Sequence, residues 1–235
     1  MIKAILFDLD GTLLPMDYDL FVKTYFSLLC KRIAPLGYNP DALIDAVWKS
    51  TYAMYKNDGK NTNEKVFWNS FKSILGEKIG EHISEFDNFY ETEFSKCKEI
   101  CGFDEKAKTV VELIKNKNIK MAVATNPIFP RTATLQRIAW AGLDKDDFAL
   151  ITTYENFSYS KPNPQYFTEI AKILQVSPSE CLMVGNDVSE DMIAEKTGMK
   201  VFLLTDCLLN KKGEDITRFN QGSFDDLINY VSKII

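Results

Sequence analysis

The segment Phe7-Asp8-Leu9-Asp10-Gly11-Thr12-Leu13-Leu14 places two carboxylates directly after the apolar run Ile2 to Phe7. A short apolar run that ends at a glycine turn is typical of a buried parallel strand. Asp8 and Asp10 then lie at the carboxyl end of this strand, the edge where open α/β sheets bind ligands. Two acidic groups this close repel each other unless a cation or a proton intervenes. The segment therefore predicts a site for chemistry at one edge of a sheet.

Strand and helix patterns alternate from about residue 102 to the end of the chain. The pattern predicts strands at 119–124, 148–153, 181–184 and 200–204, and helices at 104–115, 130–140, 164–174, 189–196 and 224–231. Such alternation is typical of a parallel sheet with helices on both faces. The first strand must join this sheet, because a lone strand cannot stand in a helical domain. We expect a doubly wound, Rossmann-like α/β core made of residues 1–15 and 101–235.

Residues 17–100 carry only helical patterns, with apolar residues three and four positions apart. Helices are predicted near 18–28, 40–59, 61–76 and 82–98, the third opened by a capping box of Asn61 and Glu64. We expect an all-helical cap, residues 16–100, inserted between the first strand and the rest of the core. Its aromatic residues favour the interior of a helical bundle over a substrate pocket: Phe21, Tyr25, Trp48, Phe67 and Phe71. Met16, Asp17 and Tyr18 lie nearest to the acidic segment in sequence.

Composition excludes several classes of partner. The 235 residues carry a formal net charge of -5 and no polybasic stretch, so nucleic acid and anionic membranes are not expected partners. No apolar run reaches the roughly 18 residues that span a bilayer, and no signal-peptide pattern is present. The five cysteines are odd in number and lack a CxxC spacing, which favours a reducing cytoplasm. The sequence does not indicate an oligomeric state.

Four segments in order resemble the motifs of the haloacid dehalogenase (HAD) superfamily of hydrolases. They are the acidic segment at 7–14, Ala124-Thr125-Asn126 after a strand, Ser160-Lys161-Pro162 before a helix, and Val184-Gly185-Asn186-Asp187-Val188-Ser189-Glu190-Asp191. The helical insertion sits where one cap type of this superfamily sits. The resemblance implies a phosphatase-type enzyme that hydrolyses a small phosphorylated metabolite.

Two of the carboxylates suit nucleophilic and acid–base chemistry. Asp8 is expected to attack phosphorus and form an aspartyl-phosphate, and Asp10 to exchange protons with the leaving oxygen and the attacking water. Thr125 and the Asn126 backbone are expected to bind the phosphoryl oxygens, and Lys161 to neutralise the charge on Asp8 and on the phosphoryl group.

The surplus of carboxylates over basic residues calls for a hard cation, and Mg²⁺ suits oxygen ligands combined with phosphate. The resemblance implies Asp8, the backbone carbonyl of Asp10, and Asp187 as Mg²⁺ ligands. Asp191, one helical turn beyond Asp187, is expected to support the metal shell or Lys161.

Other functions stay open at this point. Dehalogenation uses the same nucleophile, but enzymes of that type lack the second aspartate, so Asp10 opposes it. A sugar phosphomutase of the same superfamily would use both aspartates, and a non-catalytic phosphate-binding domain would need neither to react. The individual residues also have plain structural explanations: Asp10-Gly11 as a turn, Lys161 as a surface lysine, and Arg131 as a solvated residue in the first turn of a helix.

Overall fold

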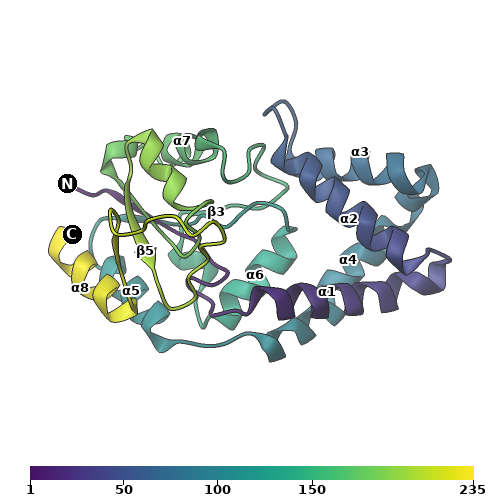
Figure 1. The fold of residues 1–235 in the computed structure, drawn as a ribbon, viewed down its shortest axis with the longest axis horizontal. Helices are drawn as coiled ribbons and strands as arrows, with labels where there is room; N and C mark the ends of the chain where they lie inside the picture. The colour runs from purple at the N-terminus through teal and green to yellow at the C-terminus, as the bar shows by residue number, and fades with distance from the viewer.

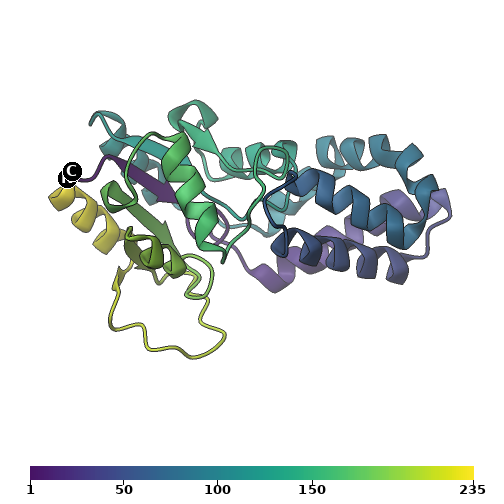
Figure 2. The same cartoon turned by 90° about the horizontal axis from the view of Figure 1, so that it is seen from above.

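Six parallel strands form the centre of the molecule, in the order β3-β2-β1-β4-β5-β6. The computed structural model describes residues 1–235 (Figures 1 and 2). The strands are β1 (Ala4–Phe7), β2 (Lys120–Val123), β3 (Leu150–Ile151), β4 (Cys181–Gly185), β5 (Lys200–Leu204) and β6 (Asn220–Gly222). β1 pairs with β2 on one side and with β4 on the other, in register from Ala4 to Phe7. The predicted parallel sheet is therefore confirmed, with the first strand at its centre.

Helices cover both faces of this sheet, as a doubly wound fold requires. The core helices are α5 (Glu105–Lys115), α6 (Arg131–Trp140), α7 (Pro164–Ile173) and α8 (Phe224–Ile234), with short 3₁₀ helices at Lys145–Asp147, Pro178–Glu180 and Met192–Thr197. Alternate residues of β1 enter different hydrophobic clusters. Ile5 and Phe7 pack with α5 and α8, whereas Ala4 and Leu6 pack with α7. The central strand is thus buried on both faces, which explains its continuous apolar sequence.

Four α-helices between β1 and α5 form the cap, which extends away from the sheet (Figure 1). They are α1 (Tyr18–Ile33), α2 (Pro40–Tyr55), α3 (Asn63–Leu75) and α4 (Ile83–Glu91), with 3₁₀ helices at Ala34–Leu36, Glu77–His82 and Glu93–Ile100. α1 begins where the Asp17 side chain accepts a hydrogen bond from the Leu20 amide, and Asn39 with Pro40 starts α2. The predicted α/β core with an inserted helical cap is confirmed.

The cap meets the core at several places, which include Tyr55 beside Glu190 and Tyr90 beside Gln136. The chain leaves and returns side by side, since the Gly102 amide donates to the Pro15 carbonyl at 2.8 Å. At the start of α3, the Asn63 amide donates to Phe157 O and the Glu64 amide to Tyr154 O, both at 2.8 Å. The buried Asn63 side chain also donates to Pro127 O and Ser160 Oγ, both at 3.0 Å. A second attachment, far from the chain crossings, therefore holds the cap.

Several element boundaries differ from the sequence predictions. The helix predicted at 82–98 is broken at Thr92, whose φ of -120° and ψ of -80° are not helical. α3 is capped by Thr62, which accepts from the Lys65 amide, so the Asn61–Glu64 capping box was wrong. The helix predicted at 189–196 is a 3₁₀ helix that begins at Met192. The predicted strand at 148–153 shortens to two residues, and the edge strand β6 was missed.

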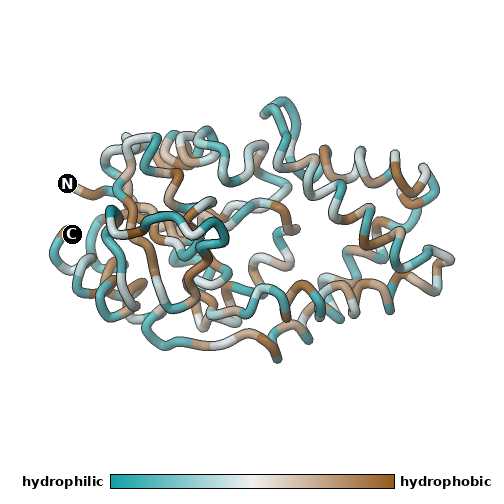
Figure 3. Tube along the Cα trace, in the orientation of Figure 1, coloured by the Kyte–Doolittle hydropathy of each residue, from teal (hydrophilic) through white to brown (hydrophobic).

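Hydropathy follows the same plan (Figure 3). The loop between β5 and β6 is mostly hydrophilic, while the central strands are apolar. No helix of the chain has the length and apolar character needed to cross a membrane.

Candidate active site

β2 and β3 lie on one side of β1, and β4, β5 and β6 lie on the other, so the strand order reverses at β1. The carboxyl ends of β1, β2 and β4 meet at this switch point. Asp8 directly follows β1, Thr125 follows β2, and Asp187 follows β4. The Asp8 amide donates to the Val184 carbonyl at 2.9 Å, which continues the ladder one residue past the strand. The fold therefore brings three of the predicted motifs to one edge.

Lys161 joins this edge from the loop before α7. Its Nζ lies 2.8 Å from Asp8 Oδ1 and 2.6 Å from Asp191 Oδ1, and its side chain is 1% exposed. Burial alone would lower the pKa of Lys161, but Asp191 and Asp8 outweigh burial and hold this pKa well above its usual value. Lys161 thus stays charged beside Asp8, which excludes the explanation that it is a surface lysine.

The turn after β1 is shaped around Gly11. Its φ is +84°, and a Cβ at this position would lie 2.3 Å from Asn186 Nδ2. Only glycine fits this left-handed, crowded position. The next residue, Thr12, places its hydroxyl 3.2 Å from Asp8 Oδ2 and 3.0 Å from Asn186 Oδ1. The turn therefore packs against the loop after β4 and fixes the second oxygen of Asp8.

Asp10 has a partner that the sequence analysis missed. Its Oδ2 forms an ion pair with Arg137 of α6, whose side chain is 1% exposed, against 25% for Asp10. The guanidinium also donates to Ala133 O and lies over the Phe129 ring, 4.5 Å from its centroid. Burial raises the pKa of the Asp10 carboxyl, and the Arg137 charge opposes this rise. Arg131 on the same helix is exposed, in line with its plain explanation.

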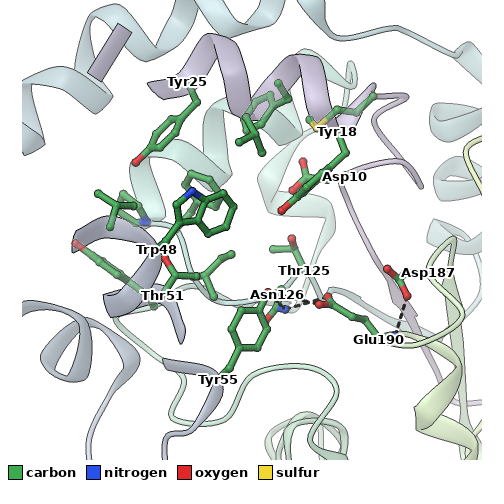
Figure 4. Close-up of a pocket in the computed structure, with 18 of the residues that line it drawn as sticks. Asp10, Tyr18, Tyr25, Trp48, Thr51, Tyr55, Thr125, Asn126, Asp187 and Glu190 are labelled. Carbon is green, nitrogen blue, oxygen red and sulfur yellow. Dashed lines mark hydrogen bonds between the residues drawn. The ribbon is translucent and has the colours of Figure 1, made fainter. Parts of the chain in front are cut away.

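Two further polar residues from the second and fourth motifs face each other across the site (Figure 4). Asn126 Nδ2 donates to Glu190 Oε2 at 3.0 Å and to the Tyr55 hydroxyl of the cap at 3.2 Å. Burial raises the pKa of Glu190 to about 7, although Lys161 lowers it. Glu190 is part of the fourth motif, but the sequence did not predict it as a site residue, because its contacts with Tyr55 and Asn126 join residues far apart in the chain.

The oxygen donors present fit a Mg²⁺ ion. Asp8 and Asp187 follow neighbouring parts of the sheet edge, and both line one pocket. No group of three or more His, Cys, Asp or Glu side chains forms a complete metal cage. Mg²⁺ does not need one, because it is commonly bound through one or two carboxylates plus phosphate and water. Asp8 and Asp187 supply two carboxylates of the kind that Mg²⁺ binds in this way.

A pocket of ≈ 190 Å³ lies between this edge and the cap. Its core side is lined by polar residues that include Asp8, Asp10, Thr125, Asn126 and Asp187. Its cap side carries Met16, Tyr18, Tyr25 and Trp48 among others. Of the three cap residues nearest to the acidic segment in sequence, Met16 and Tyr18 line the pocket, whereas Asp17 caps α1. The prediction that the cap aromatic residues serve the bundle interior and not a pocket was wrong for four of the five, because Phe21, Tyr25, Trp48 and Phe67 line the pocket. Phe71 does not line it.

A parallel α/β core, a helical cap and a buried lysine–aspartate pair at the switch point define the class of capped hydrolases with a carboxylate at the sheet edge. A family profile of haloacid dehalogenase-like hydrolases matches residues 2–196. The chain belongs to this family of hydrolases.

Relatives of known name agree with the family. The chain is 27% identical over 213 residues to "Putative phosphatase YhcW" of Bacillus subtilis, with 87% of this chain and 84% of YhcW covered. It is 28% identical over 239 residues to "Putative pyrophosphatase PpaX" of Clostridium perfringens, with 100% and 99% covered. A crystal structure of the "putative HAD-hydrolase YfnB" of Bacillus subtilis, bound to magnesium, has a TM-score of 0.58 at 17% identity, with 98% of this chain and 99% of that chain covered.

Proposed function

We propose that this hydrolase cleaves small phosphomonoesters through a covalent phosphoryl group on Asp8, with Mg²⁺ as cofactor. The observation that carries the proposal is the position of Asp8: it directly follows the central strand, its Oδ1 pairs with Lys161, and it lines the pocket. The phosphatase names of relatives that cover most of the chain support a phosphate ester as substrate.

In the first step an Asp8 oxygen forms a bond to phosphorus and the ester P–O bond breaks. Asp10 gives its proton to the departing alkoxide oxygen, so an alcohol leaves. In the second step Asp10 takes a proton from water, which attacks the phosphoryl group and releases phosphate from Asp8. Burial raises the pKa of Asp10 and so favours the protonated form that the first step needs, whereas the Arg137 charge favours the carboxylate that the second step needs.

The charge that develops on phosphorus needs fixed partners. Lys161 faces Asp8 and the phosphoryl oxygens, while the Thr125 hydroxyl and the Asn126 amide donate to the same oxygens. Asp191 holds Lys161 in place through its 2.6 Å contact. Asp8, the Asp10 carbonyl and Asp187 would hold Mg²⁺, which neutralises charge on the phosphoryl group when bound.

The cap, residues 16–100, is proposed to close over the core, residues 1–15 and 101–235, and to exclude bulk water during both steps. Tyr55 of α2 supports this arrangement, since it lies 3.4 Å from Glu190 and 3.2 Å from Asn126 in the core.

The test is release of inorganic phosphate from a panel of esters, with Mg²⁺ and with excess chelator. We expect turnover with Mg²⁺, none with chelator, and recovery when Mg²⁺ is restored. Asp8→Asn should abolish turnover, while Asp19→Asn, an exposed residue of α1, should not change it. Unchanged turnover in chelator would contradict the metal requirement. Ester isomerisation without phosphate release would instead indicate a mutase, and binding without reaction would indicate a phosphate-binding domain.

A further inference from the structure

The cap side of the pocket is built from uncharged side chains. Fifteen pocket-lining residues come from the cap, and none is Asp, Glu, Lys, Arg or His. They include Tyr18, Phe21, Tyr25, Trp48, Phe67 and Trp68. The core adds Ile128, Phe129 and Tyr154 to the same wall. The charged groups of the pocket therefore gather at the end where the phosphoryl group is proposed to react.

Several hydroxyl groups on this wall already form hydrogen bonds within the protein. The Tyr25 and Tyr90 hydroxyls lie 2.8 Å apart and bond to each other, and the Tyr55 hydroxyl faces Asn126 and Glu190. A sugar or glycerol group in this space would lose water at each of its hydroxyls, and among the cap hydroxyls only those of Tyr18 and Thr51 have no protein partner to give up. The wall is therefore unsuited to a polyhydroxylated leaving group.

Charge excludes a second class of substrate. Lys211, on the loop between β5 and β6, is the one basic residue in the pocket lining, and its Nζ lies 5.1 Å from the centroid of the Tyr18 ring. Pyrophosphate would place a second anionic group near Phe21, Tyr25 and Trp48, which are uncharged, and Lys211 is the single basic side chain of the lining that could pair with it. The pocket wall thus differs from what a pyrophosphate would require.

Trp48 indicates what the wall would contact. It is 44% exposed although it packs against Phe26, with ring centroids 5.5 Å apart. Figure 4 shows its ring directed into the pocket, on the side facing Asp10 and Thr125. A large aromatic side chain left this exposed inside a pocket gains most when an apolar group covers it.

We propose that the preferred substrates are monophosphate esters of apolar, aromatic or bulky aliphatic alcohols, with Trp48 stacked against the alcohol part. This inference rests on the proposed phosphatase function, which supplies the reaction. The alcohol leaves with the proton from Asp10, so the cap side needs only shape and apolar surface.

The experiment compares benzyl phosphate with glycerol 3-phosphate. Both release a primary alcohol, so the bond broken is the same and the cap contacts differ. We expect kcat/KM for benzyl phosphate to exceed that for glycerol 3-phosphate by about tenfold or more. Trp48→Ala should lower the benzyl phosphate value about tenfold and leave glycerol 3-phosphate nearly unchanged, and Trp48→Phe should recover part of the loss. Tyr52→Ala is the matched control, since Tyr52 lies on α2, is 61% exposed and does not line the pocket.

Binding of phosphonates separates this inference from the function on which it rests. Benzylphosphonate should bind the wild-type protein with Mg²⁺ about tenfold or more tightly than methylphosphonate, measured by calorimetry. Turnover with a preference for glycerol 3-phosphate or pyrophosphate, or equal phosphonate affinities, would overturn the apolar substrate class and leave the phosphatase standing. Selective benzylphosphonate binding without hydrolysis of any ester would overturn the phosphatase and support the apolar pocket.

Discussion

Replacing Arg137 by methionine tests how the Asp10 carboxylate is held. Met keeps a long apolar stem but removes the guanidinium, so the Asp10 charge loses its partner while most of the packing stays. Breaking a buried ion pair by removing one partner costs about 3–5 kcal/mol. Because 25% of the Asp10 side chain still faces the pocket, it regains some hydration. We therefore expect Arg137→Met to lower the free energy of unfolding by about 3 kcal/mol, the lower end of that range.

The double variant tests whether the lost stability comes from the interaction between Arg137 and Asp10. Asp10→Asn alone leaves the guanidinium, 1% exposed, without a counter-charge. In Arg137→Met with Asp10→Asn both charges are gone, so the two losses should not add. We expect the double variant to be more stable than the sum predicts by at least about 1 kcal/mol, as residues in direct contact usually show.

The assay is urea unfolding followed by circular dichroism, in excess chelator so that metal binding does not add to stability. Arg131→Met is the control, because Arg131 is an exposed arginine on the same helix and should change stability by less than about 0.5 kcal/mol. If Arg137→Met lay within about 1 kcal/mol of the wild type, or if the two losses were additive, the buried pair would not hold Asp10.

Three further outcomes are expected. Gly185→Ala should displace Asp191, because a Cβ there would lie 2.2 Å from its Oδ2, and activity should fall by at least tenfold, roughly the loss when positioning fails. Gly37→Ala has open space around it but a φ of +92°, so it should lower stability and keep activity. Lys161→Met should lower kcat/KM for every ester by a similar factor, since it acts on the shared phosphoryl group; a changed order of substrates would contradict this role. Ca²⁺ should replace Mg²⁺ poorly in the phosphate-release assay, because its larger coordination sphere misplaces the phosphate.

The sheet and the motif residues were predictable because both are local in sequence. β1 is apolar throughout and the acidic segment follows it directly, so a short window carries both signals. The order of the four motifs then places Thr125, Lys161 and Asp187 at the same sheet edge. In contrast, β6 consists of Asn220, Gln221 and Gly222, which have low strand propensity, and it forms only because it pairs with β5.

Arg137 was missed because its partner lies far away in sequence. The one local signal was its place among Ala133, Thr134 and Ile138, on the face of α6 that turns inward. An arginine on such a face requires an anion, and the fold supplies Asp10. No glycine or proline lies near Thr92 to predict the break in the helix there, so we attribute this break to tertiary packing.

The attachment at Asn63 has a consequence for how often the pocket opens. Its bonds reach Phe157 and Ser160, and Ser160 directly precedes Lys161. Opening the cap there breaks four hydrogen bonds from Asn63 and Glu64, at about 0.5–1.5 kcal/mol each. That is at least about 2 kcal/mol, which makes the open form a few per cent of the population or less. The same segment carries Lys161, so opening the cap at Asn63 would disturb the loop whose lysine pairs with Asp8 and Asp191. If the cap closes over substrate as proposed, entry of substrate and placement of Lys161 are coupled through this one loop.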